Sequence, residues 1–399
     1  MEGAAGRGHA GVTDTRLMSI VHEVSGTASY QAGASPVPAV GGRRLPFLDR
    51  ARIYACGITP YDVTHLGHAA TFVWIDALTS TLRFLGIEPE VCRNITDVDD
   101  VLDEAARRAG TPYDSFAAVQ QYHFEQDMAA LGVRAPVHGP RAHRYVQQVI
   151  RLAAGLLDGG AAYAREGSVY FRGQAAPGRA GLERAEALRL SAEYGGRPDD
   201  PAKEDPLDVA VWQASEPGHP AWDSPWGAGR PGWHAECAAM ALSVFGVGVD
   251  VHAGGKDLRF PHHAYHAAMA ETFTGVTPYA RAWLHVGTVT TGGAKMAKSA
   301  GNLVLVRDLL AGYPAAAVRL MILDRGWADD WDYRPDLLDA AAARLERLYS
   351  AAGRWAADDD VTGIGRLLAA DLNVPAAIDY AIETGGAPAR MLATVLGLS

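Results

Sequence analysis

The stretch YACGITPYDVTHLGHAATFVWIDAL, Tyr54 to Leu78, joins a short apolar strand to a long helix through a turn that contains glycine, threonine and proline. Its pattern predicts a strand at 52–56, a loop at 57–64 and a helix at 65–85. The stretch EVCRNIT, 90–96, predicts a second strand, which completes a strand–helix–strand unit. The carboxyl ends of the two strands should therefore meet at a crevice of the kind in which parallel sheets bind ligands.

Composition patterns along the 399 residues divide the chain into five parts. A loose N-terminal arm, rich in Gly, Ala, Ser and Pro, should be followed by a nucleotide-binding α/β domain that is split by a mostly helical insertion and followed by a helical appendage. The region 200–230 is rich in Pro, Gly and Trp and predicts a loop. The predicted limits are 1–45 for the arm, 46–100 and 201–306 for the two halves of the catalytic domain, 101–200 for the insertion and 307–399 for the appendage.

Charge and cysteine content restrict the classes of partner and compartment. A formal net charge of -10 gives no broad attraction to phosphate backbones, so no nucleic-acid partner is expected. No run of 18 apolar residues and no signal-peptide core occurs, which predicts a cytoplasmic protein without a membrane partner. The three cysteines lie far apart in the sequence, which favours a reducing compartment over a disulfide framework.

The two histidines of HLGH, His65 and His68, flank the predicted start of the helix. A helix N-terminus binds anions because its first N–H groups are unpaired, and Gly67 between the histidines lets a ligand approach closely. This pattern suits a triphosphate, although a metal site or a surface histidine pair would share the same spacing.

A second motif, KMAKS, lies at 295–299 in a loop that contains glycine. Lys295 and Lys298 place two ammonium groups three residues apart, as needed to neutralise pyrophosphate as it leaves. Taken alone, the motif would be a solvated basic loop.

Thiol and imidazole groups predict a zinc site. Cys56, Cys237 and the stretch FPHHAYH, 260–266, supply these ligands, and His262 and His266 at positions i and i+4 would project from one helix face. Trp233 shares a helix face with Cys237 and could form a wall of the same pocket. In isolation each cysteine would be interpreted as a buried core thiol and each histidine as a surface residue.

HLGH and KMAKS, in this order around an insertion, resemble the two signature motifs of class I aminoacyl-tRNA synthetases. The stretches YACGITPYD, RNITDVDD, GRPGWHAECAAMAL, GGKDLRFPHH and KMAKSAGNLV are similar to the cysteinyl branch, and more specifically to its tRNA-independent relatives, the cysteine ligases of mycothiol biosynthesis. The similarity runs from about Arg52 to the C-terminus. Only about a hundred residues follow the lysine loop, which is short for an anticodon-reading extension.

The resemblance implies a class I synthetase Rossmann-like fold with an inserted connective domain and a C-terminal helical appendage. It also implies a monomer that activates cysteine with Mg²⁺-ATP as cysteinyl-adenylate, on zinc, and transfers it to the amine of glucosaminyl-inositol. By resemblance, His65, His68, Lys295 and Lys298 are catalytic. ATP would be bound by His65, Gly67, His68, Lys295, Met296, Lys298 and Ser299; cysteine by Thr59, Thr96, Trp233 and Asp257; and zinc by Cys56, Cys237 and His262, with His266 as an optional fourth ligand.

Four positions depart from the family pattern. His266 stands where a Glu or a small residue is usual, Ala264 replaces an acidic residue, Lys256 replaces a Ser, and Ala297 replaces the middle Ser of the lysine loop. These departures leave open a paralogue that activates cysteine or a related amino acid for another amine. A shortened cysteinyl-tRNA synthetase and a non-catalytic binding protein are further alternatives.

Overall fold

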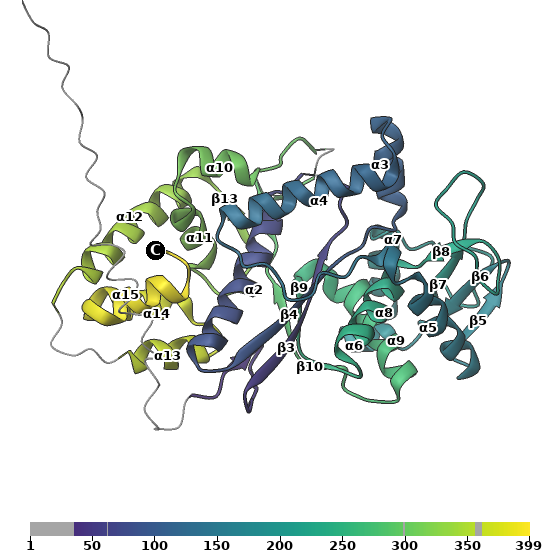
Figure 1. The fold of residues 1–399 in the computed structure, drawn as a ribbon, viewed down its shortest axis with the longest axis horizontal. Coiled ribbons are helices and arrows are strands. Elements are labelled where there is room, and N and C mark those ends of the chain that lie inside the picture. The colour runs from purple at the N-terminus through teal and green to yellow at the C-terminus, as the bar shows by residue number, and fades with distance from the viewer. Residues whose placement is uncertain (1–35, 62, 298–299, 356–360) are drawn as a thin grey trace, which may run out of the picture. The chain divides into compact units, whose positions relative to one another are not determined.

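The computed structural model describes residues 36–61, 63–297, 300–355 and 361–399. At the centre of the α/β fold lies a parallel sheet in the order β10-β9-β3-β4. Its strands are β3 (Arg50–Ile58), β4 (Glu88–Ile95), β9 (Val249–Gly255) and β10 (Ala280–Val286). The middle pair, β3 and β9, comes from the two halves of the chain that the insertion separates (Figure 1).

Helices cover both faces of this sheet (Figure 1). Helix α2 (Leu66–Phe84) follows β3, and its apolar side chains, including Phe72, Trp74 and Leu78, are buried in the main hydrophobic core. Helix α8 (Trp233–Phe245) packs against β3 and β4, and α9 (Ala264–Thr274) packs against α8. The predicted strand–helix–strand unit is thus present, with observed limits close to those predicted.

The insertion between β4 and α8 contains an antiparallel sheet in the order β5-β6-β7-β8. Its strands are β5 (Ala162–Arg165), β6 (Ser168–Phe171), β7 (Val209–Ala214) and β8 (Gly229–Pro231). Its helices are α3 (Asp100–Ala109), α4 (Tyr113–Ala130), α5 (Val146–Asp158), α6 (Ala176–Arg179) and α7 (Arg184–Glu193).

The sequence-based loop at 200–230 differs from the structure. Strand β7 falls within that loop, and β8 carries the sheet to Pro231, beyond the predicted end of the insertion at 200. Val211 and Trp212 of β7 are fully buried, and β7 pairs with β6, about forty residues earlier in the chain. The strand depends on this distant partner, so the local composition, rich in turn residues, could not reveal it.

The C-terminal region is helical, as predicted. It consists of α10 (Val306–Gly312), α11 (Ala315–Leu323), α12 (Pro335–Ala352), α13 (Thr362–Ala369), α14 (Val374–Thr384) and α15 (Gly386–Val395). A small sheet in the order β12-β11-β13 joins the lysine loop to this region through β11 (Val289–Thr291), β12 (Ala294–Lys295) and β13 (Trp331–Tyr333).

A buried ion pair connects the appendage to the nucleotide fold. Arg319 of α11 and Asp76 of α2 approach to 2.7 Å, and both side chains are almost completely inaccessible. Arg319 also donates to the carbonyl oxygens of Leu131 and Leu396, and the Asp76 carboxylate accepts from the Arg134 backbone N–H. We call Arg319, Asp76 and these backbone groups the Arg319 cluster.

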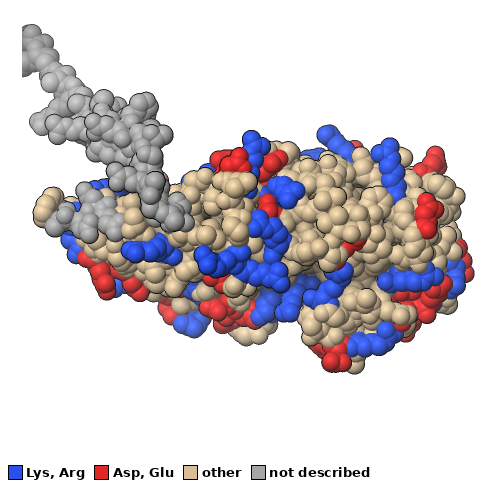
Figure 2. All heavy atoms as spheres, turned by 90° about the horizontal axis from the view of Figure 1, so that it is seen from below, with Lys and Arg blue, Asp and Glu red and all other residues tan. Residues whose placement is uncertain are grey.

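Residues 1–35 of the predicted arm, 1–45, lie outside the described residues. Residues 36–45 contain a short hairpin of β1 (Ala39–Val40) and β2 (Arg43–Arg44), whose turn places Gly41 and Gly42 at positive φ. Among the described helices, none is both long and apolar enough to cross a membrane. On the face drawn in Figure 2, basic and acidic side chains are interspersed.

Candidate active site

Two cysteines and a histidine meet below the carboxyl end of the central sheet. Cys56 lies near the end of β3, Cys237 on α8, and His262 just before α9. One ligand atom from each lies within 4.8 Å of the others, and all three residues are buried. Three of the four predicted metal ligands are therefore brought together by segments about two hundred residues apart.

Neighbouring side chains hold these three residues in place. His262 approaches Cys237 Sγ through Nε2 at 3.2 Å and His234 Nδ1 through Nδ1 at 2.9 Å. Asn94 donates from Nδ2 to Cys237 Sγ at 3.2 Å, while its Oδ1 accepts from the Gly57 N–H. Asn94 and His234 were missed in the sequence analysis, although an Asn in the buried strand EVCRNIT is a recognisable signal.

Further buried imidazoles lie beside these three residues. Among the described residues, Cys56, His252 and His263 form a second group with metal-ligand spacing, with His252 Nε2 at 3.4 Å from Cys56 Sγ. His266 belongs to neither group: it is fully buried against Tyr54 and His252, and neither of its ring nitrogens has a hydrogen-bond partner. We call Cys56, Cys237, His252, His262, His263 and His266 the thiol–imidazole cluster.

The protonation preferences of the cluster fit a cation. Burial, followed by the neighbouring Cys237 thiol, raises the pKa of Cys56 well above its usual range, and burial lowers the pKa of His262 so that it stays neutral. A zinc ion offsets the cost of two adjacent buried thiolates and prefers sulfur and neutral imidazole ligands. Two thiols and one imidazole within reach of one point are thus a donor set that fits zinc, with one position left for a substrate.

The HLGH motif forms the N-terminal cap of α2. His65 is the cap residue, and its Nδ1 accepts from the Gly67 N–H at 3.1 Å, while the His65 N–H points to His68 Nδ1 at 3.5 Å. The two rings lie 3.9 Å apart between centroids. A Cβ on Gly67 would come within 2.9 Å of the His65 ring, so only glycine permits this arrangement.

This capping pattern defines the chemical state of both rings. A ring nitrogen that accepts a backbone N–H carries no proton, so hydrogen-bond partners assign both histidines as neutral with the remaining proton on Nε2. Burial, and then the proximity of His65, lowers the pKa of His68 to about 3. Both rings can therefore act as N–H donors at neutral pH.

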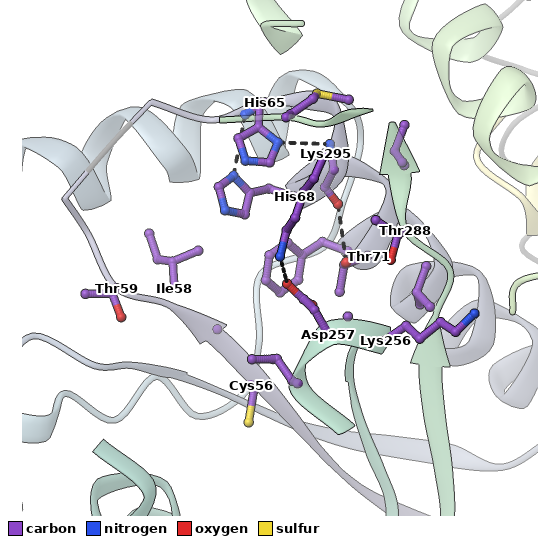
Figure 3. Close-up of a pocket in the computed structure, with 18 of the residues that line it drawn as sticks. Cys56, Ile58, Thr59, His65, His68, Thr71, Lys256, Asp257, Thr288 and Lys295 are labelled. Atoms are coloured by element: carbon purple, nitrogen blue, oxygen red, sulfur yellow. Dashed lines mark hydrogen bonds and ion pairs between the residues drawn. The ribbon is translucent and has the colours of Figure 1, made fainter. Parts of the chain in front are cut away.

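Lys295 and Asp257 face each other across the opening of the cavity (Figure 3). Lys295 Nζ lies 2.9 Å from Asp257 Oδ2 and 5.2 Å from the centre of the Tyr194 ring. Burial lowers the pKa of Lys295, but Asp257 and Tyr194 outweigh it, so the ammonium form is favoured. Lys298 and Ser299, the other predicted members of the lysine loop, lie outside the described residues.

A cavity of about 320 Å³ brings most of the predicted site residues together. Of the predicted residues, those lining it are Cys56, Thr59, His65, Gly67, His68, Trp233, Asp257, Lys295 and Met296. Thr96 lies behind it and contacts Thr59 through their hydroxyl groups at 2.8 Å. Trp233, which also lines the cavity, stacks on His262 with 4.2 Å between ring centroids, so the indole lies beside the thiol–imidazole cluster.

Of the departures from the family pattern, only Lys256 lines this cavity. Lys256 extends to Asp330 at 2.6 Å, Ala264 is buried, and the Ala297 N–H donates to Asn302 Oδ1. Lys256 thus pairs with Asp330 rather than with Asp257. The Asp257 carboxylate therefore stays available to a ligand or to Lys295.

Comparisons with known proteins agree with this geometry. The family model for the "tRNA synthetases class I (C) catalytic domain" matches residues 47–343. A protein of Mycolicibacterium vanbaalenii named L-cysteine:1D-myo-inositol 2-amino-2-deoxy-alpha-D-glucopyranoside ligase is 45% identical over 339 residues, which cover 82% of this chain and 79% of that protein. A ligase of the same name from Mycobacterium ulcerans is 43% identical over 370 residues, covering 86% and 90%. The chain belongs to this ligase family.

The chain's membership of the ligase family confirms the predicted resemblance. The chain is therefore an enzyme of the class I synthetase type. Solved structures confirm the fold. Methionyl-tRNA synthetase of Mycobacterium tuberculosis, in complex with methionyl-adenylate, aligns over 88% of this chain and 82% of its own, with TM-score 0.59 and 17% identity. The LeuRS–tRNA–LeuAMS complex of Agrobacterium radiobacter K84 aligns over 88% and 83%, with TM-score 0.60 and 11% identity.

Proposed function

We propose that the chain is an ATP-dependent, AMP-forming ligase that activates L-cysteine and joins it to the amine of glucosaminyl-inositol. One observation carries this proposal: the buried group of Cys56, Cys237 and His262 reaches, through Cys56, a cavity that the two neutral histidines of HLGH also line. The first feature suits a thiol-bearing substrate and the second a phosphate chain. The names of the related ligases supply the identity of the acceptor.

Cysteine selection would rest on the base of the cavity. Cys56, Cys237 and His262 would hold zinc, which supplies a Lewis-acid position for the substrate thiolate and is a far poorer match for a serine hydroxyl. Asp257 would pair with the substrate ammonium group after releasing Lys295, and Thr59, positioned by Thr96, would hold the substrate backbone. Trp233 would close the pocket over the side chain.

Residues at the rim of the cavity would activate the cysteine carboxylate. A carboxylate oxygen of cysteine forms a bond to the α-phosphorus of Mg²⁺-ATP, and the bond from that phosphorus to the bridging oxygen breaks, so pyrophosphate leaves with the electron pair. His65 and His68 would donate through Nε2–H to the phosphates, and Lys295 and Lys298 would neutralise the leaving group. The product of this step is cysteinyl-adenylate.

Transfer would then form the amide. The acceptor amine attacks the carbonyl carbon of the mixed anhydride, the carbon–oxygen bond to AMP breaks, and the nitrogen loses one proton. Binding two reactants in one pocket replaces a bimolecular encounter, which can contribute about 7–11 kcal/mol to lowering the barrier.

The test is amino-acid-dependent ATP–pyrophosphate exchange on zinc-loaded protein, with cysteine, serine and a panel of other amino acids. Exchange with cysteine alone, and amide plus AMP formation after glucosaminyl-inositol is added, would support the proposal. Exchange without turnover of the amino-sugar would favour a paralogue with another acceptor. Charging of tRNA would favour a shortened synthetase, and no exchange with any amino acid would contradict catalysis by this site.

A further inference from the structure

A second cavity, of about 230 Å³, adjoins the active-site cavity, and Trp233 lines both. Its walls come from the segment after β4, the chain that follows α7, and strands β7 and β8. Tyr194 lines this second cavity and contacts Lys295, which lines the first. The two spaces therefore border each other along one side of the inserted sheet.

The polar groups around the second cavity alternate in sign. Arg230 pairs with Asp100 at 2.6 Å, and the Gln213 amide, with its oxygen turned toward the two guanidinium groups, accepts from Arg230 and Arg197 at 2.9 and 2.6 Å. On another wall, the Tyr170 hydroxyl donates to Asp200 Oδ2 at 3.1 Å. Donors and acceptors are thus interleaved rather than gathered into one basic or acidic surface.

Such a lining selects for hydroxyl groups. Each hydroxyl donates one hydrogen bond and accepts others, so a polyol can bond to carboxylates and guanidinium groups at once. The carboxylates Asp99, Asp100 and Asp200 in the same lining would repel a phosphate, whose oxygens carry negative charge. At about 230 Å³ the cavity has room for one six-membered ring that carries hydroxyl groups.

The position of the cavity relates it to the transfer step. His234 lines it and contacts His262, and Trp233 stacks on the same His262. A molecule in the second cavity would therefore lie beside His234 and Trp233, the two side chains that contact His262. An amine that extends from it past the indole would enter the first cavity without displacing ATP.

We propose that this second cavity, which we call the acceptor cavity, binds a hydroxyl-bearing ring of the amine acceptor, with Arg197, Asp200 and Tyr170 as its specificity residues. The inference rests on the proposed function, and it adds a location and the chemical class of the ligand: a cyclic polyhydroxylated amine. Gln213 and Arg230 position Arg197 and Asp100 for the same purpose.

The test compares Arg197→Ala and Tyr170→Phe with a matched control, Arg189→Ala. Arg189 is an exposed residue of α7 whose partners are Glu186 and Glu193, and it does not line the acceptor cavity. We expect each cavity variant to raise the KM for glucosaminyl-inositol at least tenfold while cysteine-dependent pyrophosphate exchange changes less than twofold. The control should change neither quantity, and unchanged acceptor KM in both cavity variants would overturn the proposal.

A binding measurement separates failure of this inference from failure of the proposed function. Calorimetric titration of the full chain with glucosaminyl-inositol needs no turnover, so it decides the question even if no exchange is found. Binding that weakens at least tenfold in Arg197→Ala supports the acceptor cavity. Equal binding in wild type and variant, or no binding of glucosaminyl-inositol at all, would contradict it.

Discussion

Two of the buried polar clusters, the Arg319 cluster and the thiol–imidazole cluster, differ in how completely their polar atoms are paired. In the Arg319 cluster, every guanidinium nitrogen of Arg319 has a partner, and both carboxylate oxygens of Asp76 accept hydrogen bonds. In the thiol–imidazole cluster, His252 Nδ1, His263 Nε2 and both nitrogens of His266 have none. Buried polar atoms in folded proteins are nearly always satisfied, so a pocket with several unsatisfied atoms is one that a ligand completes.

This difference assigns opposite roles to the two clusters. The Arg319 cluster joins α2 to α11 and to the carbonyl groups of Leu131 and Leu396, so it serves the fold. The thiol–imidazole cluster has unpaired buried groups beside a cavity, and these groups destabilise the fold. Such unfavourable groups are expected at a binding site, where the residues serve ligand binding rather than stability.

The largest predicted effect is on Cys237. Cys237→Ala removes one of two thiol ligands, so we expect zinc content to fall from one per chain to near zero and cysteine-dependent exchange to fall at least ~10⁴-fold, about 5 kcal/mol of transition-state stabilisation. Zinc is measured by mass spectrometry of dialysed protein. Cys92→Ala is the control, because Cys92 is equally buried but lies outside both ligand groups; retention of zinc in Cys237→Ala would argue against the cluster as a metal site.

A second prediction concerns the Arg319 cluster. Arg319→Met leaves the Asp76 carboxylate buried without its cation, so the free energy of unfolding should fall by about 3–5 kcal/mol with zinc content unchanged. Denaturant unfolding followed by fluorescence measures this change. Arg334→Met is the control, since Arg334 forms an exposed pair with Asp336 and its loss should leave the free energy of unfolding nearly unchanged. Loss of zinc in folded Arg319→Met would remove the distinction between the clusters.

His266 tests whether the unpaired atoms of the thiol–imidazole cluster all serve the metal. Because its ring lies outside both ligand groups, His266→Leu should keep zinc affinity and exchange activity, and it should leave the free energy of unfolding unchanged or raise it by about 1 kcal/mol. A chelator competition assay measures the affinity. A tenfold weaker affinity in the variant would instead identify His266 as a fourth ligand.

A further small effect is the pH dependence of stability that His68 causes. Its folded pKa of about 3 lies below the unfolded value of about 6.5, so the unfolded chain takes up the proton first as the pH falls. The stability associated with neutral His68 is thus complete above about pH 6.5 and declines below it. Since the ring is partly accessible, the free energy of unfolding of the wild type should fall by only about 1 kcal/mol more than that of His68→Gln between pH 7 and pH 5. Parallel pH profiles of the free energy of unfolding in the two proteins would contradict this.

Local sequence patterns correctly predicted the helices and strands that are determined by the residues within them. The Tyr54–Leu78 stretch combines a strand, a cap and an amphipathic helix, and its element limits were nearly correct. Strands β7 and β8 were missed because their pairing partners lie elsewhere in the chain and their own composition is that of a loop. The pattern along the chain predicted that an insertion splits the nucleotide fold, and the resemblance to class I synthetases implied the same arrangement.

The site residues that belong to sequence motifs were predicted, and those outside the motifs were missed. HLGH, Cys56 and FPHH identified the rim and the base, but Asn94, His234 and His252 act through contacts with residues far away in the sequence. A histidine within the buried strand VDVHAGG is the one signal that could have been used for His252. Arg319 offers a similar signal, as a lone charge in the apolar helix AAAVRLMIL.

The most direct test of the central claim is zinc K-edge X-ray absorption of the zinc-loaded protein with and without cysteine. The account predicts two sulfur ligands and at least one nitrogen ligand from the protein, and a third sulfur ligand when cysteine is added but not when serine is added. A first shell that does not change with cysteine, or one that lacks protein sulfur, would contradict substrate binding at Cys56, Cys237 and His262.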